Sequence, residues 1–100
     1  MIQIKIDQKE KVDSITVEGH AGYGVSGTDI VCASVSSILI TTINAMLRVD
    51  EKSIHYEQKE AYVKLDILKH SDTIDLLMDN LVSLLEELEN DYSKYVKINQ

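Results

Sequence analysis

The chain has 100 residues, 44% of them hydrophobic and 27% charged, with a formal net charge of −7, which suits a single globular domain over residues 1–100 with its own core. The acidic balance, without a cluster of Lys or Arg, argues against direct nucleic-acid binding, and no apolar run approaches the roughly 20 residues that a membrane span needs. The single cysteine excludes an internal disulfide and the N-terminal residues lack a signal-peptide core, so we expect a cytoplasmic protein without a membrane partner.

The first half of the chain alternates apolar and polar residues and then changes to helical spacing. Alternation over residues 2–6 and 14–18 predicts two strands of a hairpin, with a turn at residues 7–11. A stripe of apolar residues spaced three and four apart then predicts a helix over residues 30–48.

The second half follows the same order. Strands are expected at residues 53–57 and 61–67, with a turn at residues 58–60 between them. A second helix begins with Ser71 or Asp72 as its N-cap, and a short strand ends the chain. The order ββαββαβ predicts an α+β domain in which two helices pack on a mixed sheet.

Residues able to carry chemistry gather between the second strand and the first helix. With Thr28 or Asp29 as N-cap, Cys32 lies in the first helical turn, and His20 ends the preceding strand. A helix N-terminus or a nearby imidazolium stabilises a thiolate, so His20 and Cys32 could act as base and nucleophile in acyl transfer. Backbone N–H groups around Cys32 and Ala33 would then hold the developing oxyanion.

Other interpretations of this segment remain open from residue types alone. Cys32 could be a small buried residue and His20 a strand-end residue. Phosphate binding is disfavoured, because Gly27 is followed by Thr28 and Asp29 where a P-loop has Lys and Ser or Thr.

The remaining histidines are expected to be structural. His55 falls in a strand at an exposed or half-exposed position, and His70 directly precedes the second helix. Three scattered histidines and one cysteine lack the spacing of zinc ligands, so we expect neither a metal nor a cofactor.

Two segments carry a resemblance to a known family. Gly-His-Ala at residues 19–21 and Gly-Thr-Asp-Ile-Val-Cys-Ala-Ser-Val-Ser at residues 27–36 resemble the ribosomal-processing cysteine protease family, Prp. The length and the ββα opening extend the resemblance over essentially the whole chain. It implies a homodimeric endopeptidase that removes the N-terminal extension of a bacterial large-subunit ribosomal protein, with Cys32 as nucleophile and His20 as general base.

The resemblance also implies supporting residues. Asp29 could orient His20 or only cap the helix, and Ser36, one turn after Cys32, could contact substrate or only permit close packing. The segment over residues 21–28 is expected to move and admit an extended peptide. Three glycines of this substrate loop are candidates: Gly22, Gly24 and Gly27.

A non-catalytic module that binds a basic ribosomal-protein tail through its acidic surface is the alternative function. The acidic end at residues 86–91 could provide such a contact, although a solvated helix face is the simpler interpretation. The two functions differ in the thiol: only the protease needs Cys32 to react faster with iodoacetamide than an ordinary thiol does.

Overall fold

The computed structural model describes residues 1–19 and 28–100, with the backbone alone for Thr28 and Asp29. The elements of this part are β1 (Ile2–Gln8), β2 (Val12–Glu18), α1 (Thr28–Val49), β3 (Ile54–Lys59), β4 (Tyr62–Ile67), α2 (Asp72–Asp91) and β5 (Val96–Asn99). The predicted α+β class and the order ββαββαβ are confirmed.

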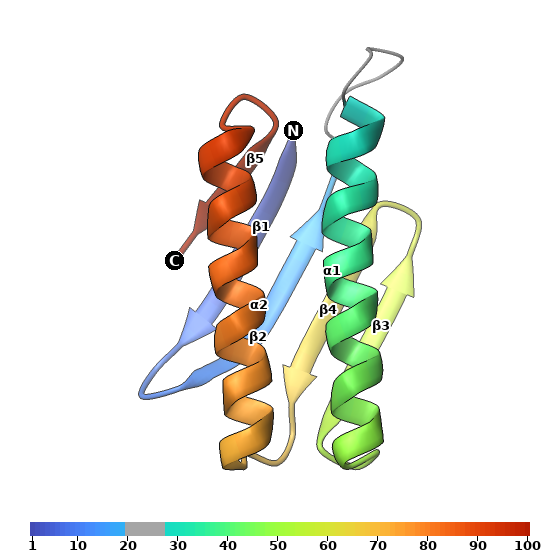
Figure 1. Ribbon diagram of the computed structural model, residues 1–100, viewed down its shortest axis with the longest axis vertical. Coiled ribbons are helices and arrows are strands. Elements are labelled where there is room, and N and C mark those ends of the chain that lie inside the picture. The colour runs from blue at the N-terminus through green and yellow to red at the C-terminus, as the bar shows by residue number, and fades with distance from the viewer. Residues whose placement is uncertain (20–27) are drawn as a thin grey trace.

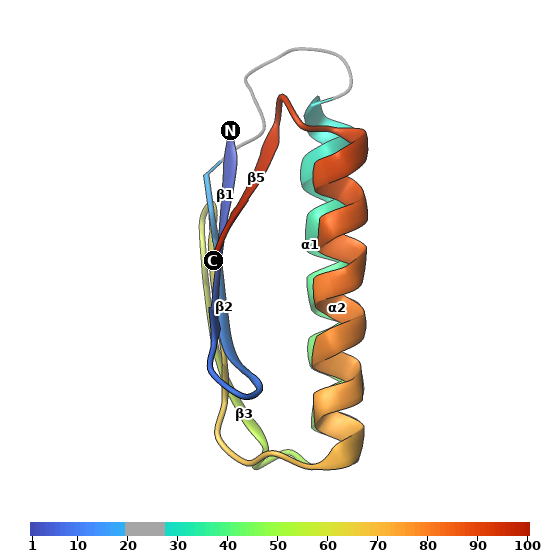
Figure 2. The same ribbon diagram turned by 90° about the vertical axis from the view of Figure 1, so that its left-hand side faces the viewer.

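The strands form one mixed sheet in the order β3-β4-β2-β1-β5. The pairs β1–β2, β2–β4 and β3–β4 are antiparallel, whereas β5 lies parallel to β1. Both helices cover the same face of this sheet and run side by side along it (Figures 1 and 2). The helix side chains that face the strands and the inward strand side chains therefore form the core between the two layers.

Apolar side chains at helical spacing supply the helix half of this core. Those of α1 are Val31, Val35, Leu39, Ile43 and Met46, and those of α2 are Ile74, Met78, Leu81 and Leu85, all buried. Ser71 caps α2 as predicted, since its side chain accepts a 3.2 Å hydrogen bond from the N–H of Ile74.

Helix α1 contradicts the expectation that no segment of the chain is long and apolar enough to span a membrane. Ile30–Val49 is long and apolar enough to cross a membrane by length and composition. The expectation is wrong because the exposed positions of this segment before Arg48 hold no charged residue. They are occupied by Ser, Thr, Ala and Asn together with Ile30 and Ile40. In this fold the same helix is a core helix whose buried side faces the sheet, and such helices meet the same criteria of length and composition.

The turn of the β3–β4 hairpin is shorter than predicted and lies later in the chain. Lys59 pairs with Tyr62, so the turn consists of Glu60 and Ala61 and not of residues 58–60. Ala61, expected in a strand, has a φ of +56°. Ala61 adds one more apolar position to the alternation of Val63, Leu65 and Ile67, which is why the pattern placed it in the strand.

Leu81→Ala is expected to lower the free energy of unfolding by about 2–5 kcal/mol, because Leu81 is fully buried and the deletion leaves a cavity. The matched control is Leu76→Ala on the same helix, where the side chain is 66% exposed and a change within about 0.5 kcal/mol is expected. Urea denaturation of both variants measures the difference. Equal losses would contradict the assignment of Leu81 to the core.

A charged cluster closes the end of the molecule where α2 begins. His70 Nδ1 lies 2.6 Å from Asp75 and its Nε2 lies 2.8 Å from Asp13 of β2. Lys11 Nζ lies 2.9 Å from the other oxygen of Asp75. Hydrogen bonds to Asp75 and then to Asp13 raise the pKa of His70, and the hydrogen bond from His70 lowers the pKa of Asp75. The protonated ring thus joins two carboxylates from different elements.

His70→Gln is expected to cost about 1 kcal/mol of unfolding free energy at pH 5.5, discounted for partial exposure, and less at pH 8.5. Because the pKa of His70 is raised in the folded protein, its hydrogen bonds to the carboxylates stabilise the fold fully below pH 6.5, the usual pKa of histidine. This stabilisation is lost as the pH rises through the raised pKa. Because the pKa of Asp75 is lowered in the folded protein, its ionised carboxylate stabilises the fold above pH 3.8, the usual pKa of aspartate. This stabilisation is lost as the pH falls through the lowered pKa. Denaturation at both pH values, with the exposed His55→Gln as control, measures this; a pH-independent cost would contradict it.

Candidate active site

Cys32 lies deeper in its helix than predicted. Because α1 begins at Thr28, Cys32 is its fifth residue and not part of its first turn. Helical side chains tilt toward the N-terminus, so the thiol still leans over the first turn of the helix. Asp29 is the second residue of α1, and its side chain lies outside the described part of the chain.

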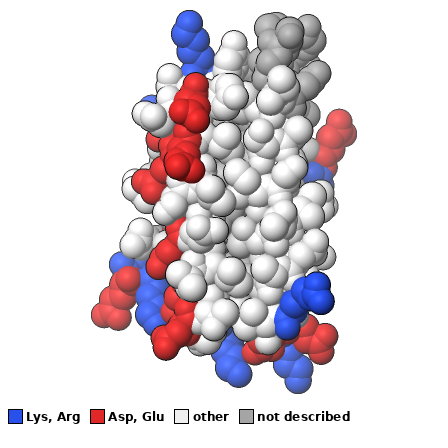
Figure 3. All heavy atoms as spheres, viewed as in Figure 1, with Lys and Arg blue, Asp and Glu red and all other residues white. Residues whose placement is uncertain are grey.

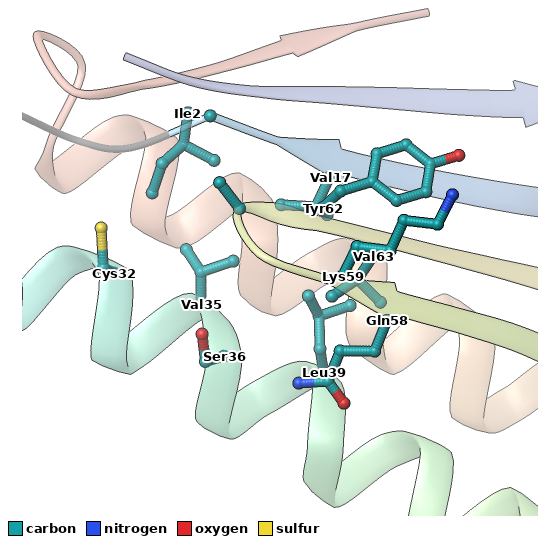
Figure 4. Close-up of a pocket in the computed structure, with 12 residues that line it drawn as sticks. Ile2, Val17, Cys32, Val35, Ser36, Leu39, Gln58, Lys59, Tyr62 and Val63 are labelled. Carbon is teal, nitrogen blue, oxygen red and sulfur yellow. The ribbon is translucent and has the colours of Figure 1, made fainter.

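Cys32 opens onto a pocket between the start of α1 and the β3–β4 turn. This pocket has a volume of about 280 Å³. The described residues that line it are Ile2, Val17, Gly19, Cys32, Val35, Ser36, Leu39, Gln58, Lys59, Ala61, Tyr62 and Val63. Figure 4 shows the Cys32 sulfur pointing from α1 toward the sheet, with the β3–β4 residues across the pocket from the helix.

The pocket has an apolar base and a polar rim. Val17, Val35 and Leu39 are buried, whereas Ser36 is exposed. Lys59 is the charged residue among the described lining residues, and its Nζ lies 6.0 Å from the ring centroid of Tyr62. A lining of this kind suits an uncharged, partly apolar group better than a highly charged ligand.

Charge on the helix-covered face is unevenly distributed. Acidic side chains follow α2, and the surface over α1 is mostly uncharged (Figure 3). The α2 segment holds seven acidic residues and no basic one: Asp72, Asp75, Asp79, Glu86, Glu87, Glu89 and Asp91. Cys32 therefore lies on the helix whose outer surface carries little charge.

The structure describes only some of the predicted site residues. Ser36 lines the same pocket as Cys32, as expected for two residues one helical turn apart. His20, with the candidate loop residues Gly22, Gly24 and Gly27, lies outside the described residues. The pairing of His20 with Cys32 remains a prediction. In residues 1–19 and 28–100 no group of three His, Cys, Asp or Glu side chains is arranged to hold a metal ion.

The β3–β4 wall was missed by sequence reasoning. Gln58, Lys59 and Tyr62 are more than 20 residues from Cys32 in sequence. They reach the pocket only because β4 pairs with β2 and carries β3 at the sheet edge beside α1. No local pattern in the sequence indicates this contact.

Comparison with known proteins gives the same family as the sequence motifs. Residues 1–97 match the family model described as cysteine protease Prp. A ribosomal processing cysteine protease Prp from Staphylococcus aureus is 25% identical over 101 residues, covering 98% of this chain and 95% of that protein. The fold is also similar to crystal structures of the S. aureus protease. The structure with a covalently linked product peptide has a TM-score of 0.89 at 24% identity, covering 99% of this chain and 98% of that one. The structure with a substrate peptide has a TM-score of 0.90 at 23% identity, with the same coverage.

Proposed function

The chain belongs to the cysteine protease Prp family, and we propose that it removes the N-terminal extension of a bacterial large-subunit ribosomal protein. The observation that carries this proposal is the pocket beside Cys32, in a chain whose family model spans residues 1–97. The family identifies a cysteine protease, which disfavours the non-catalytic binding module. The similar S. aureus protein is named for ribosomal processing, and its solved complexes hold substrate and product peptides.

In the proposed reaction Cys32 is the nucleophile and His20 the general base. His20 accepts the thiol proton, and the Cys32 sulfur attacks the scissile carbonyl to form a tetrahedral oxyanion. The oxyanion collapses to a thioester as the C–N bond breaks, and protonated His20 gives its proton to the leaving amine. Water, deprotonated by His20, then attacks the thioester, which releases the carboxylate product and returns the proton to the Cys32 sulfur.

Other parts of the chain support this reaction in the proposal. The pocket between α1 and the β3–β4 turn accepts a side chain of the substrate, and Ser36 contacts the peptide at the pocket rim. Asp29, the second residue of α1 and not its N-cap, adds a negative charge to the first helical turn. The expected substrate loop over residues 21–28 lies outside the described residues, except that Thr28 is the first residue of α1.

The proposed setting is the cytoplasm, where ribosomal proteins are made, and the proposed active form is a homodimer. Neither a metal nor a cofactor takes part in this scheme, because thiol acyl transfer needs only the base, the nucleophile and donors for the oxyanion. Sedimentation equilibrium measures the oligomeric state directly, and a monomer at working concentration would contradict the dimer.

A peptide that spans the extension junction tests the function. Incubation with the parent protein, followed by mass spectrometry, is expected to show one cut that leaves the mature N-terminus. Iodoacetamide is expected to label Cys32 faster at neutral pH than it labels an ordinary thiol. An intact peptide together with ordinary labelling would favour binding of the basic tail without cleavage.

A further inference from the structure

The chain leaves β2 through a glycine that is confined on two sides. Gly19 follows the last residue of β2 and has a φ of +96°. Its N–H donates a 2.9 Å hydrogen bond to the carbonyl of Ala61. An L side chain at this position would place its Cβ 2.6 Å from the carbonyl oxygen of Met1, closer than Cβ atoms approach other atoms. Position 19 therefore requires glycine for both its backbone angle and its space.

The groups that confine Gly19 are held by the sheet. The N–H of Ile2 donates a 2.8 Å hydrogen bond to the carbonyl of Tyr95, and β1 pairs with both β2 and β5. The carbonyl of Met1, next to Ile2, is thus fixed at the end of β1. Ala61 lies in the two-residue turn that joins β3 to β4, and β4 pairs with β2. A side chain at position 19 would have to displace backbone from a paired strand.

Ala61 has an unfavourable backbone conformation of its own. Its φ of +56° is disfavoured for a residue with a Cβ. In the part of the chain that the structure describes, Gly19 and Ala61 are the residues with positive φ. They are hydrogen-bonded to each other, and both line the pocket that contains Cys32. Backbone strain retained at a pocket wall suggests a functional requirement for that geometry.

We propose that Gly19 and Ala61 form a backbone clamp that positions the catalytic base relative to Cys32. The proposal rests on the proposed function, in which His20, covalently next to Gly19, transfers the thiol proton. The clamp fixes the point and the direction in which the main chain leaves the sheet beside the pocket. Proton transfer requires hydrogen-bond reach, so a displacement of about 1 Å can slow the reaction about 100-fold. Gly19 is thus a positioning residue and touches no reacting atom itself.

Gly19→Ala tests the clamp with a comparison at the same position. We expect kcat for the junction peptide to fall about 100-fold with KM within about threefold, because the pocket remains while the base is displaced. Gly19→D-Ala keeps the left-handed conformation but removes the freedom of glycine. It can be made by ligating a synthetic peptide of residues 1–31 to residues 32–100 at Cys32. Its kcat is expected to stay within about threefold of the parent value.

The two variants distinguish a Gly19 that must hold one backbone conformation from a Gly19 that must act as a hinge. A D-alanine variant as slow as Gly19→Ala would show that the site needs movement at position 19, and would overturn the clamp. Full activity of a folded Gly19→Ala protein would also overturn it. A parent protein that leaves the peptide intact would instead refute the proposed function; exchange of the Gly19 amide proton would still report the hydrogen bond to Ala61.

A substitution of Ala61, in the β3–β4 turn, also tests the clamp, in case Gly19→Ala lowers the yield of folded protein. Ala61→Val places a β-branched residue where φ is positive, which should displace the carbonyl that accepts from Gly19. We expect faster hydrogen exchange at the Gly19 amide and a lower kcat. Glu60→Val is the control, because Glu60 shares the turn but is not among the described pocket residues. Equal exchange and kcat in the two variants would contradict the proposal.

Discussion

Cys32→Ala is expected to lower kcat/KM for the junction peptide by about 10⁴-fold or more. The substitution removes the only sulfur nucleophile of the chain that could form a thioester. The pocket lining other than residue 32 is unchanged, so peptide binding should persist while cleavage stops. Initial rates followed by mass spectrometry at several peptide concentrations separate these two effects. Tight binding of uncleaved peptide would show that the loss lies in the chemical step.

The control for this variant comes from the same helix. Ser37→Ala changes an exposed residue of α1 that is not among the described residues of the pocket, and its kcat/KM should stay within about twofold of the parent value. Thermal unfolding of both variants checks that the fold is retained. Cleavage by Cys32→Ala at the parent rate would show that another residue carries the chemistry.

Much of the fold is predictable because burial is one-sided in elements such as β1 and α2. Ile2, Ile4 and Ile6 alternate with polar residues, and all three are buried against the helices. The apolar stripe of α2 predicts its buried face, and Ser71 is the predicted N-cap. These signals are local, and the physical cause of each acts within a few residues.

Features that depend on contacts between distant elements were not predictable. The backbone N–H of Ile98 donates a 2.6 Å hydrogen bond to the carboxylate of Glu89, which ties β5 to α2. From the sequence, Glu89 belonged to a solvated acidic end. His70 was placed correctly before α2, but its two carboxylate partners lie on different elements and only one is near it in sequence. Such pairs depend on how β2 and α2 are packed.

The candidate site also has one part that local sequence predicts and one part that depends on contacts between distant elements. Cys32 and Ser36 were predictable as one face of a helix because they are one turn apart. The opposite wall depends on a two-residue turn with a left-handed alanine, whose position determines which β3 and β4 side chains reach the pocket. The predicted alternation placed Ala61 in a strand and the turn at residues 58–60, so it did not identify the turn of Glu60 and Ala61.

His20→Ala is expected to lower kcat by about 10²- to 10⁴-fold, the range that a positioned general base contributes. His20 lies outside the described residues, so a chemical test addresses its role most directly. Free imidazole in the assay should restore part of the lost rate, because it can accept the thiol proton from the space that the side chain leaves. The rate should then rise with the concentration of neutral imidazole. Cys32→Ala should show no such rescue, because it retains the base and lacks the nucleophile.

His55→Ala is the matched control for this test, since His55 is an exposed residue of β3 that is not among the described pocket residues. Its kcat should remain within about twofold of the parent value, with no response to imidazole. A His20→Ala protein that is folded and fully active would mean that Cys32 obtains its base elsewhere. The clamp at Gly19 would then have no base to position. Loss of rate without rescue, together with a lowered melting temperature, would assign His20 a structural role.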